Sequence, residues 1–169
     1  HRRLATRRGW AGRWDRMMAE PTIAAPSSLP PIDVAGDLWP DPQVLGLAED
    51  RCPGRQQGGR QAGMERLASF LETRGEAYRF SMSSPVTASS RCSRISPYLA
   101  FGSLSMREVW QACRNNVQTL ADRPPETRRA WRQSLKSFDS RLHWHCHFIQ
   151  KLEDEPAAEF RSFLSLIHI

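Results

Sequence analysis

The feature that most constrains the fold is a long amphipathic pattern in the last third of the chain. Over residues 125–153, apolar side chains recur at steps of three and four: Trp131, Leu135, Phe138, Leu142, Cys146 and Ile149. This spacing places them on a single stripe of an α-helix. Pro156 follows, and proline cannot continue a helix. We therefore expect one long helix over 125–153 whose stripe packs against the rest of the domain.

A second helix is predicted over 60–74, where Leu67, Phe70 and Leu71 share one face. Gly75 follows at the position where a helix commonly ends in a left-handed residue, so we expect it to be the C-terminal cap. The next stretch, 78–94, is dense in serine and is predicted to be a loop.

Two further helices begin at recognisable signals. Ser96 is a favourable N-cap and Pro97 a favourable first residue, so a short helix should begin there and end at Gly102. Ser105 and Glu108 have the spacing of a capping box and predict another helix start. No segment shows a convincing two-residue alternation, so the predicted fold class is all-α.

Residues 19–57 are rich in Pro, Asp and Gly and are predicted to run extended. We therefore divide the chain into an extended linker over 1–57, a helical domain over 58–163 and a tail over 164–169. The tail, LSLIHI, resembles the translated end of a sequencing adapter and is treated as an artefact.

The composition favours an anionic partner without requiring one. The chain has 24 Lys+Arg against 18 Asp+Glu, a formal net charge of +6. This charge suits nucleic acid, phosphate or a membrane surface, and it equally suits a protein with arginine-rich faces. The four cysteines contain no CxxC pair, which favours free thiols in a reducing compartment. The sequence contains no stretch of about 18 apolar residues, the length needed to span a membrane. We expect a cytoplasmic location.

The run RLHWHCHFIQ, residues 141–150, raises the question of a metal site. At about 100° per residue, His143 and His147 fall on the polar flank with Lys136 and Gln150, whereas His145 lies at the edge of the apolar stripe. The three histidines do not converge, and a zinc site needs a nearly complete set of ligands. We expect no metal here and interpret Cys146 as a small core residue.

Two other groups of residues could bind a ligand. Ser93 and Arg94 precede the helix start at Ser96, where hydroxyls, free backbone N–H groups and a guanidinium could form a phosphate cradle. A purely structural cap remains the alternative. Trp144 lies with Phe148 near the border between core and surface, where an aromatic side chain either packs or forms a ligand platform.

The order of the sequence blocks resembles the DNA photolyase and cryptochrome family. SRISPYLAFGSLSMREVWQA (93–112) is similar to the family pattern T-S-x-L-S-P-x-L followed by G-x-L-S. CPGRQQGGRQAGMERLASFL is similar to the glycine-rich entry helix of the family's flavin domain, and Trp144 with the later EDEP resembles its W-R-E-F block. The resemblance extends from about Gly36 to Phe160. It implies a helical fragment of a photolyase/cryptochrome-type FAD-binding domain, preceded by an extended Pro-rich linker.

The resemblance also implies roles for single residues. The FAD phosphates would be held by the loop Cys92, Ser93, Arg94, Ile95 and Ser96, in which Cys92 replaces the family's Thr. Tyr78 matches a flavin-contacting Tyr. On the long helix, Trp144 matches the Trp beside a flipped pyrimidine dimer, His145 replaces an Arg that reaches the phosphates, and Arg141 replaces a Glu that contacts the lesion.

The implied function is light-driven electron transfer from FAD to pyrimidine dimers in DNA. The family's N-terminal α/β domain, with its antenna pigment, and the second half of its helical domain are not recognised in this chain. We therefore expect an inactive, monomeric fragment of an enzyme that binds damaged DNA. A cryptochrome that signals to a partner is the alternative, and Arg141 favours it. A helical nucleic-acid- or metal-binding module without flavin is a third possibility.

Overall fold

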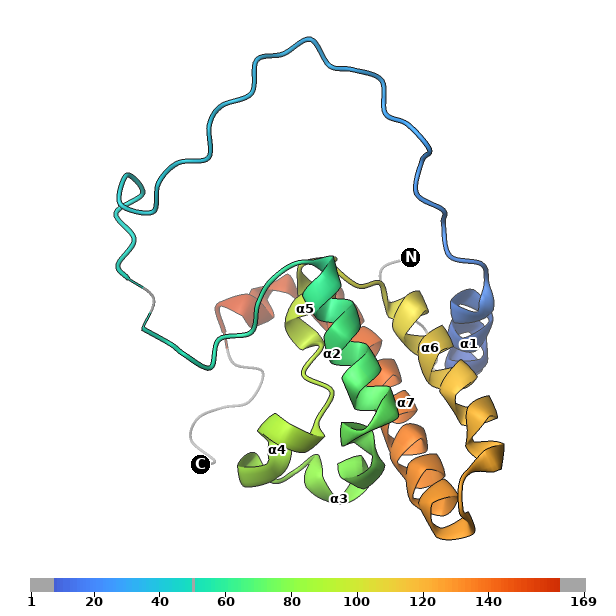
Figure 1. Cartoon of the computed structure of the whole chain (residues 1–169). Coiled ribbons are helices and arrows are strands. Elements are labelled where there is room, and N and C mark those ends of the chain that lie inside the picture. Colours follow the sequence, from blue (N-terminus) through green and yellow to red (C-terminus); the bar gives the residue numbers. More distant parts are fainter. Residues whose placement is uncertain (1–7, 50, 162–169) are drawn as a thin grey trace. The chain divides into compact units, whose positions relative to one another are not determined.

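The computed structural model describes residues 8–49 and 51–161 of the chain. Within these ranges it contains helices and no β-strand, which confirms the all-α prediction. The tail over 164–169 lies outside the described residues. The elements are α1 (Trp10–Ala19), α2 (Arg60–Glu72), η1 (Arg74–Ala77), α3 (Tyr78–Ser81), α4 (Pro85–Arg91), α5 (Ser96–Ala100), α6 (Met106–Thr119), η2 (Leu120–Asp122), α7 (Pro125–Asp154) and η3 (Pro156–Glu159), where η marks a 3₁₀ helix (Figure 1).

The chain divides into two units, of which the smaller is Thr22–Gln57. None of the described helices lies in this unit, as expected for its proline content. A tight turn over 41–47 is closed by hydrogen bonds that include Gln43 N to Asp41 Oδ1 at 2.8 Å and Leu47 N to Pro42 O at 2.9 Å. The large apolar side chains of this unit are exposed, and Trp39, for example, is 97% exposed. Among the described helices of the chain, none combines the length and hydropathy needed to cross a membrane.

The helix α7 is the central element of the other unit. It ends at Asp154, one residue beyond the predicted end, and it packs against η1, α3 and α6. Four residues of its predicted stripe are at most 3% exposed: Trp131, Leu135, Phe138 and Leu142. Cys146 is only half-buried, and the prediction was wrong for Ile149, which is 55% exposed. The reason is that the described neighbours cover the stripe only partly along the last turns of α7.

Gly75 does not cap α2, contrary to the sequence prediction. The helix α2 ends at Glu72, and Gly75 lies inside η1, where it is buried. A Cβ atom at Gly75 would lie 2.5 Å from the carbonyl oxygen of Phe70 and 3.1 Å from Cζ3 of Trp131. Glycine is therefore needed here mainly because the Phe70 carbonyl of α2 leaves no room for a Cβ atom, with Trp131 of α7 as a second tight neighbour, and not because of a left-handed backbone.

The predicted loop over 78–94 is largely helical, since it contains α3 and α4. Tyr78, the first residue of α3, is buried against Phe70 and Phe138. The buried hydroxyl of Ser134 on α7 donates to the carbonyl oxygen of Glu76 at 2.6 Å and accepts from Arg79 N at 3.1 Å. Serine content alone predicted a loop, whereas these contacts with α7 stabilise short helical turns.

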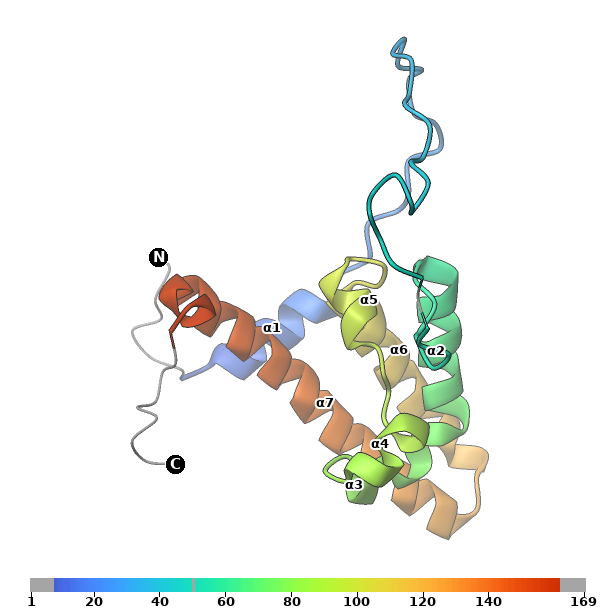
Figure 2. The ribbon, with the colours of Figure 1, turned by 90° about the vertical axis from the view of Figure 1, so that its left-hand side faces the viewer.

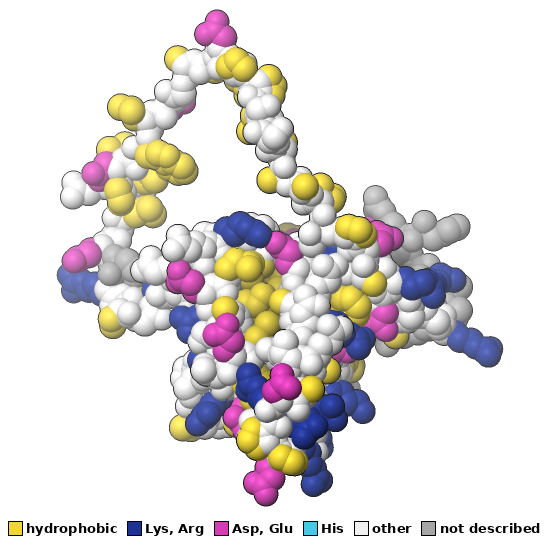
Figure 3. Space-filling view, turned by 45° about the vertical axis from the view of Figure 1, so that its right-hand side comes forward, with side chains coloured by type: hydrophobic (Ala, Val, Ile, Leu, Met, Phe, Trp, Pro, Cys, Tyr) yellow, Lys and Arg dark blue, Asp and Glu magenta, His cyan; other side chains and the backbone are white. Residues whose placement is uncertain are grey.

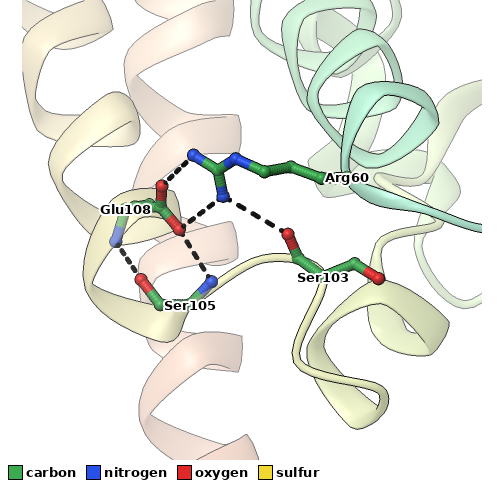
Figure 4. Close-up of polar contacts among 4 residues, drawn as sticks. All are labelled: Arg60, Ser103, Ser105 and Glu108. Carbon is green, nitrogen blue, oxygen red and sulfur yellow. Dashed lines mark hydrogen bonds and ion pairs between the residues drawn. The ribbon is translucent and has the colours of Figure 1, made fainter. Parts of the chain in front are cut away.

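The start of α6 is as predicted. Glu108 N donates to Ser105 Oγ at 3.1 Å, and Ser105 N donates to Glu108 Oε2 at 3.0 Å, which is the reciprocal capping box. Arg60, the first residue of α2, donates to Glu108 Oε1 at 2.5 Å and to the carbonyl oxygen of Ser103 at 3.4 Å (Figure 4). Gly102 ends the preceding α5 with a φ of 69°, as expected. The capping box thus also joins the beginnings of α2 and α6.

The helix α1 was missed by the sequence analysis, which assigned 1–57 to an extended linker. Trp14 and Met18, one turn apart, are buried and pack on the helical unit, where α1 contacts α6. Gln111 of α6 donates to the carbonyl oxygens of Met18 at 2.9 Å and Glu20 at 2.8 Å, which satisfies acceptors at the end of α1. The Trp10, Trp14, Met18 spacing could have indicated this helix.

Candidate functional site

The loop over 92–96 connects α4 to α5 and is held by one side chain of η1. The guanidinium of Arg74 donates to the carbonyl oxygens of Cys92 and, at 3.3 Å, of Ser93. It also donates to the carbonyl oxygen of Arg66 at 2.9 Å and to Ser69 Oγ at 2.9 Å, both on α2. Arg74 therefore fixes the backbone of the first half of the loop against α2.

The next residue, Arg94, has a φ of 59°, which is the left-handed region that non-glycine residues rarely adopt. Ile95 follows and is buried, at 3% exposed. Its carbonyl oxygen accepts the first hydrogen bond of α5, from Leu99 N at 3.1 Å. The N-cap is therefore Ile95, and Ser96 is an exposed first residue of α5 with no capping hydrogen bond. The predicted cap at Ser96 was wrong, because the helix begins one residue earlier.

Cations surround this loop. Burial lowers the pKa of Arg74, and the nearby charges of Arg66 and Arg94 lower it further. In the part of the chain that the structure describes, no carboxylate forms an ion pair with Arg74 or Arg66. The hydrogen bonds of Arg74 go to neutral oxygens, so its positive charge is solvated by the protein without being neutralised.

The structure brings Tyr78 and Arg141 to the same region. Burial raises the pKa of Tyr78, the neighbouring Cys92 raises it further, and Arg141 of α7 opposes the shift. Burial also raises the pKa of Cys92, against the effect of Arg94 and Arg74. Tyr78 therefore lies within electrostatic range of both Cys92 and Arg141.

Two other predicted residues lie further along α7. His145 follows Arg141 by one helical turn, so the two share a face. Its Nδ1 atom is buried and has no hydrogen-bond partner among the residues that the structure describes. Trp144 is 48% exposed and its ring lies 5.7 Å from those of both His147 and Phe148. An exposed aromatic cluster therefore lies beside His145.

His143 is not on a solvent-facing flank, contrary to the sequence prediction. Its Nε2 atom lies 3.1 Å from Asp15 Oδ1 of α1, and its Nδ1 atom lies 2.9 Å from the carbonyl oxygen of Asp139. Its ring packs against Trp14, with centroids 4.0 Å apart. Within residues 8–49 and 51–161, no three His, Cys, Asp or Glu side chains are grouped as metal ligands.

Sequence analysis did not identify Arg74 as part of this site. It lies 18 residues before Cys92, and no spacing rule connects the two positions. The only available signal was a cation beside a glycine at the end of a helix, which is common on protein surfaces. Ser93, Arg94 and Ser96 were predicted from the helix start at Ser96-Pro97, and the resemblance to the family pattern added Cys92 and Ile95.

Comparison with known proteins identifies no relative: no protein-family model, no curated protein and no solved structure matches this chain significantly. The resemblance drawn from the sequence blocks therefore remains a proposal, and so do the roles that it implies.

Proposed function

We propose that this chain is the first part of an FAD-binding helical domain from a photolyase-like flavoprotein, and that the loop over 92–96 binds the FAD diphosphate. The observation that carries the proposal is that Arg74, the cation that holds this loop, donates its hydrogen bonds to neutral oxygens, so that no described carboxylate neutralises its charge. Arg66 and Arg94 are close enough to lower the pKa of Arg74, and a diphosphate would neutralise the charge of Arg74. The order of the sequence blocks gives independent support.

The geometry suits an anion at this position. Arg74 fixes the loop carbonyls of Cys92 and Ser93, so the loop would not need to become ordered when a ligand binds. Ser93 supplies a hydroxyl beside it, and the exposed Ser96 hydroxyl is not occupied in capping α5. His145 has a buried ring nitrogen with no partner in the described part of the chain, which a phosphate oxygen or a ribose hydroxyl could satisfy.

Bound FAD would supply light-driven electron transfer, and the chain would contribute binding and orientation. Trp144, half-exposed beside Phe148, is suited to stacking on a base displaced from DNA. Positive charge for a DNA backbone is present on the same unit. Lys and Arg side chains gather near the end where α6 passes into α7 (Figure 3), and the residues there are Arg123, Arg128, Arg129 and Arg132.

A cryptochrome-type photoreceptor is the second candidate, and Arg141 favours it. Arg141 stands where the resembled family has the Glu that contacts the lesion, and it is exposed on α7 one turn before His145. A cation there attracts phosphate and cannot accept hydrogen bonds from a pyrimidine dimer. Equal affinity for damaged and undamaged duplex oligonucleotides would favour the photoreceptor, whereas a preference for the thymine dimer that is lost in Trp144→Ala would favour repair.

The diphosphate site can be tested on the 169-residue chain by NMR titration. FAD and ADP should shift the backbone amide signals of 92–96, whereas riboflavin, which lacks phosphates, should not. We expect weak binding, because the isoalloxazine contacts are not recognised in this chain. Arg94→Gln should weaken ADP binding about tenfold, the loss expected for a hydrogen bond between charged groups.

Arg91→Gln is the matched control, since Arg91 is an exposed arginine at the end of α4. It should leave ADP affinity within about twofold, because it lies outside the loop. Absence of any amide shift at 92–96 with ADP at about 10 mM would refute the diphosphate site. Equal responses to ADP and riboflavin would refute the phosphate contact.

A further inference from the structure

A groove of about 420 Å³ lies between α1 and the second half of α7. Figure 2 shows α1 beside this part of α7. The lining side chains come from the start of α1 and from one face of α7: Trp10, Ala11, Lys136, Asp139, Ser140, His143, Trp144, His147 and Gln150. This volume is within the range of small-molecule sites in proteins.

The two walls are held together by His143. His143, on α7, is connected to α1 by its contact with Asp15 at 3.1 Å and by the ring of Trp10, whose centroid lies 5.9 Å from its own. Its other ring nitrogen lies 2.9 Å from the Asp139 carbonyl within α7. The groove is thus formed by packing within the helical unit. The indoles of Trp10 and Trp144 and the imidazole of His147 give it flat apolar surfaces that suit an aromatic ring.

The polar groups of the groove define the ligand further. Asp139 Oδ1 is buried and has no hydrogen-bond partner among the described residues, whereas its Oδ2 atom lies 3.9 Å from Nδ1 of His143, so Oδ1 is an acceptor that lacks a donor. Lys136 is exposed one turn before Ser140, and Arg132 is exposed one turn before Lys136. The structure shows no ion pair to either cation among the described residues. The groove therefore offers an aromatic floor, a buried acceptor and a basic rim.

We propose that this groove binds a nucleotide whose base carries an exocyclic amino group. The base would stack on the indoles and donate from its amine to Asp139, and its phosphate would lie at Lys136 and Arg132. An organic cation would also suit indoles and a carboxylate, but the basic rim disfavours it. The nucleotide could be free or part of a single strand, and both sources share this chemistry.

This site is separate from the proposed diphosphate site. At about 100° per residue, His143 lies roughly 160° around α7 from Arg141, so the groove and the 92–96 loop face different sides of the helix. Trp144 lies at the border between the two faces. The inference does not rest on the proposed flavin function, and each can fail without the other.

The test is a titration of the full chain with AMP, followed through the indole N–H signals of Trp10 and Trp144 by NMR. Purine ribonucleoside 5′-monophosphate lacks the amine and adenosine lacks the phosphate, so both should bind about tenfold more weakly than AMP. An oligo(dA) arm identifies the source of the nucleotide: tighter binding than AMP indicates a single strand, and equal or weaker binding indicates the free nucleotide.

Two substitutions separate the contacts. Asp139→Asn should weaken AMP binding about tenfold and leave the affinity for purine ribonucleoside 5′-monophosphate within about twofold, because only AMP can donate a hydrogen bond from an amine. Lys136→Met should weaken AMP binding and leave the affinity for adenosine unchanged. Lys151→Met is the matched control, since Lys151 is the other lysine of α7 and bonds to Glu155 at 2.9 Å, away from the groove.

Three results would overturn the proposal. The first is AMP affinity that is unchanged in both Asp139→Asn and Lys136→Met. The second is no response of the Trp10 and Trp144 signals to AMP at about 10 mM. The third is displacement of AMP by choline, which would show that the groove takes an organic cation.

Discussion

Replacing Glu108 by Gln tests how the start of α6 stabilises the fold. Gln keeps the size of the side chain and can still complete a capping box with Ser105. It removes the negative charge that faces Arg60, whose guanidinium lies 2.5 Å from Glu108 Oε1. The substitution therefore isolates the charge of the Arg60–Glu108 pair from the cap.

The pKa of Glu108 indicates the size of the effect. The hydrogen bond from Arg60 is the largest cause, followed by the Ser105 backbone N–H, and together with smaller effects they lower the pKa of Glu108 from 4.5 to about 2. This shift corresponds to at most about 3 kcal/mol of stabilisation at neutral pH. Arg60 is largely exposed and water screens the pair, so we expect Glu108→Gln to cost about 1 kcal/mol.

The dependence on pH gives the sharper test. Because the folded pKa is depressed, the stabilisation is complete above pH 4.5 and is lost as the pH falls toward 2. Urea unfolding followed by far-UV circular dichroism should show a difference of about 1 kcal/mol between wild type and Glu108→Gln at pH 7. The difference should shrink steadily below pH 4.5. Equal stability at pH 7, or a difference that persists unchanged at pH 2.5, would refute the reasoning.

Four further substitutions test packing and thiol chemistry. Gly75→Ala should lower the free energy of unfolding by about 2–3 kcal/mol, because its Cβ would meet the Phe70 carbonyl at 2.5 Å. In Gly63→Ala the new Cβ would meet Leu104 and Tyr98 at 3.1 Å. This variant should change the free energy of unfolding by less than about 1 kcal/mol, since the gain in helix propensity offsets the tight contact. Similar urea midpoints for Gly75→Ala and Gly63→Ala would contradict this expectation. Burial, with a smaller effect of Asp139, raises the pKa of Cys113 to about 12, whereas Cys52 is exposed, so a disulfide-forming thiol reagent at pH 8 should modify Cys52 quickly and Cys113 only after unfolding. Cys52→Ser should remove the fast phase and Cys113→Ser should leave it unchanged, and the reverse pattern would show that Cys113 is accessible.

Sequence alone was sufficient for the elements that depend on local interactions. The long helix α7 was predicted to within one residue at its end, because its apolar stripe repeats over many turns and Pro125 and Pro156 flank it. The capping box of α6 was predicted from Ser105 and Glu108, whose hydrogen bonds join residues three apart. These features require no partner that is distant in the sequence.

Only the tertiary structure determined which of these residues meet. The carbonyls of Cys92 and Ser93 are bound by Arg74, which lies outside the predicted loop. Gly75 is needed because the Phe70 carbonyl and the Trp131 ring leave no room for a Cβ atom. The groove depends on α1, a ten-residue helix that is too short to be stable by itself and that is buried through contacts with α6 and His143. Contacts between residues far apart in the chain leave no periodic signal in one sequence, so the helices could be predicted from local patterns, whereas the composition of both candidate sites was set by packing.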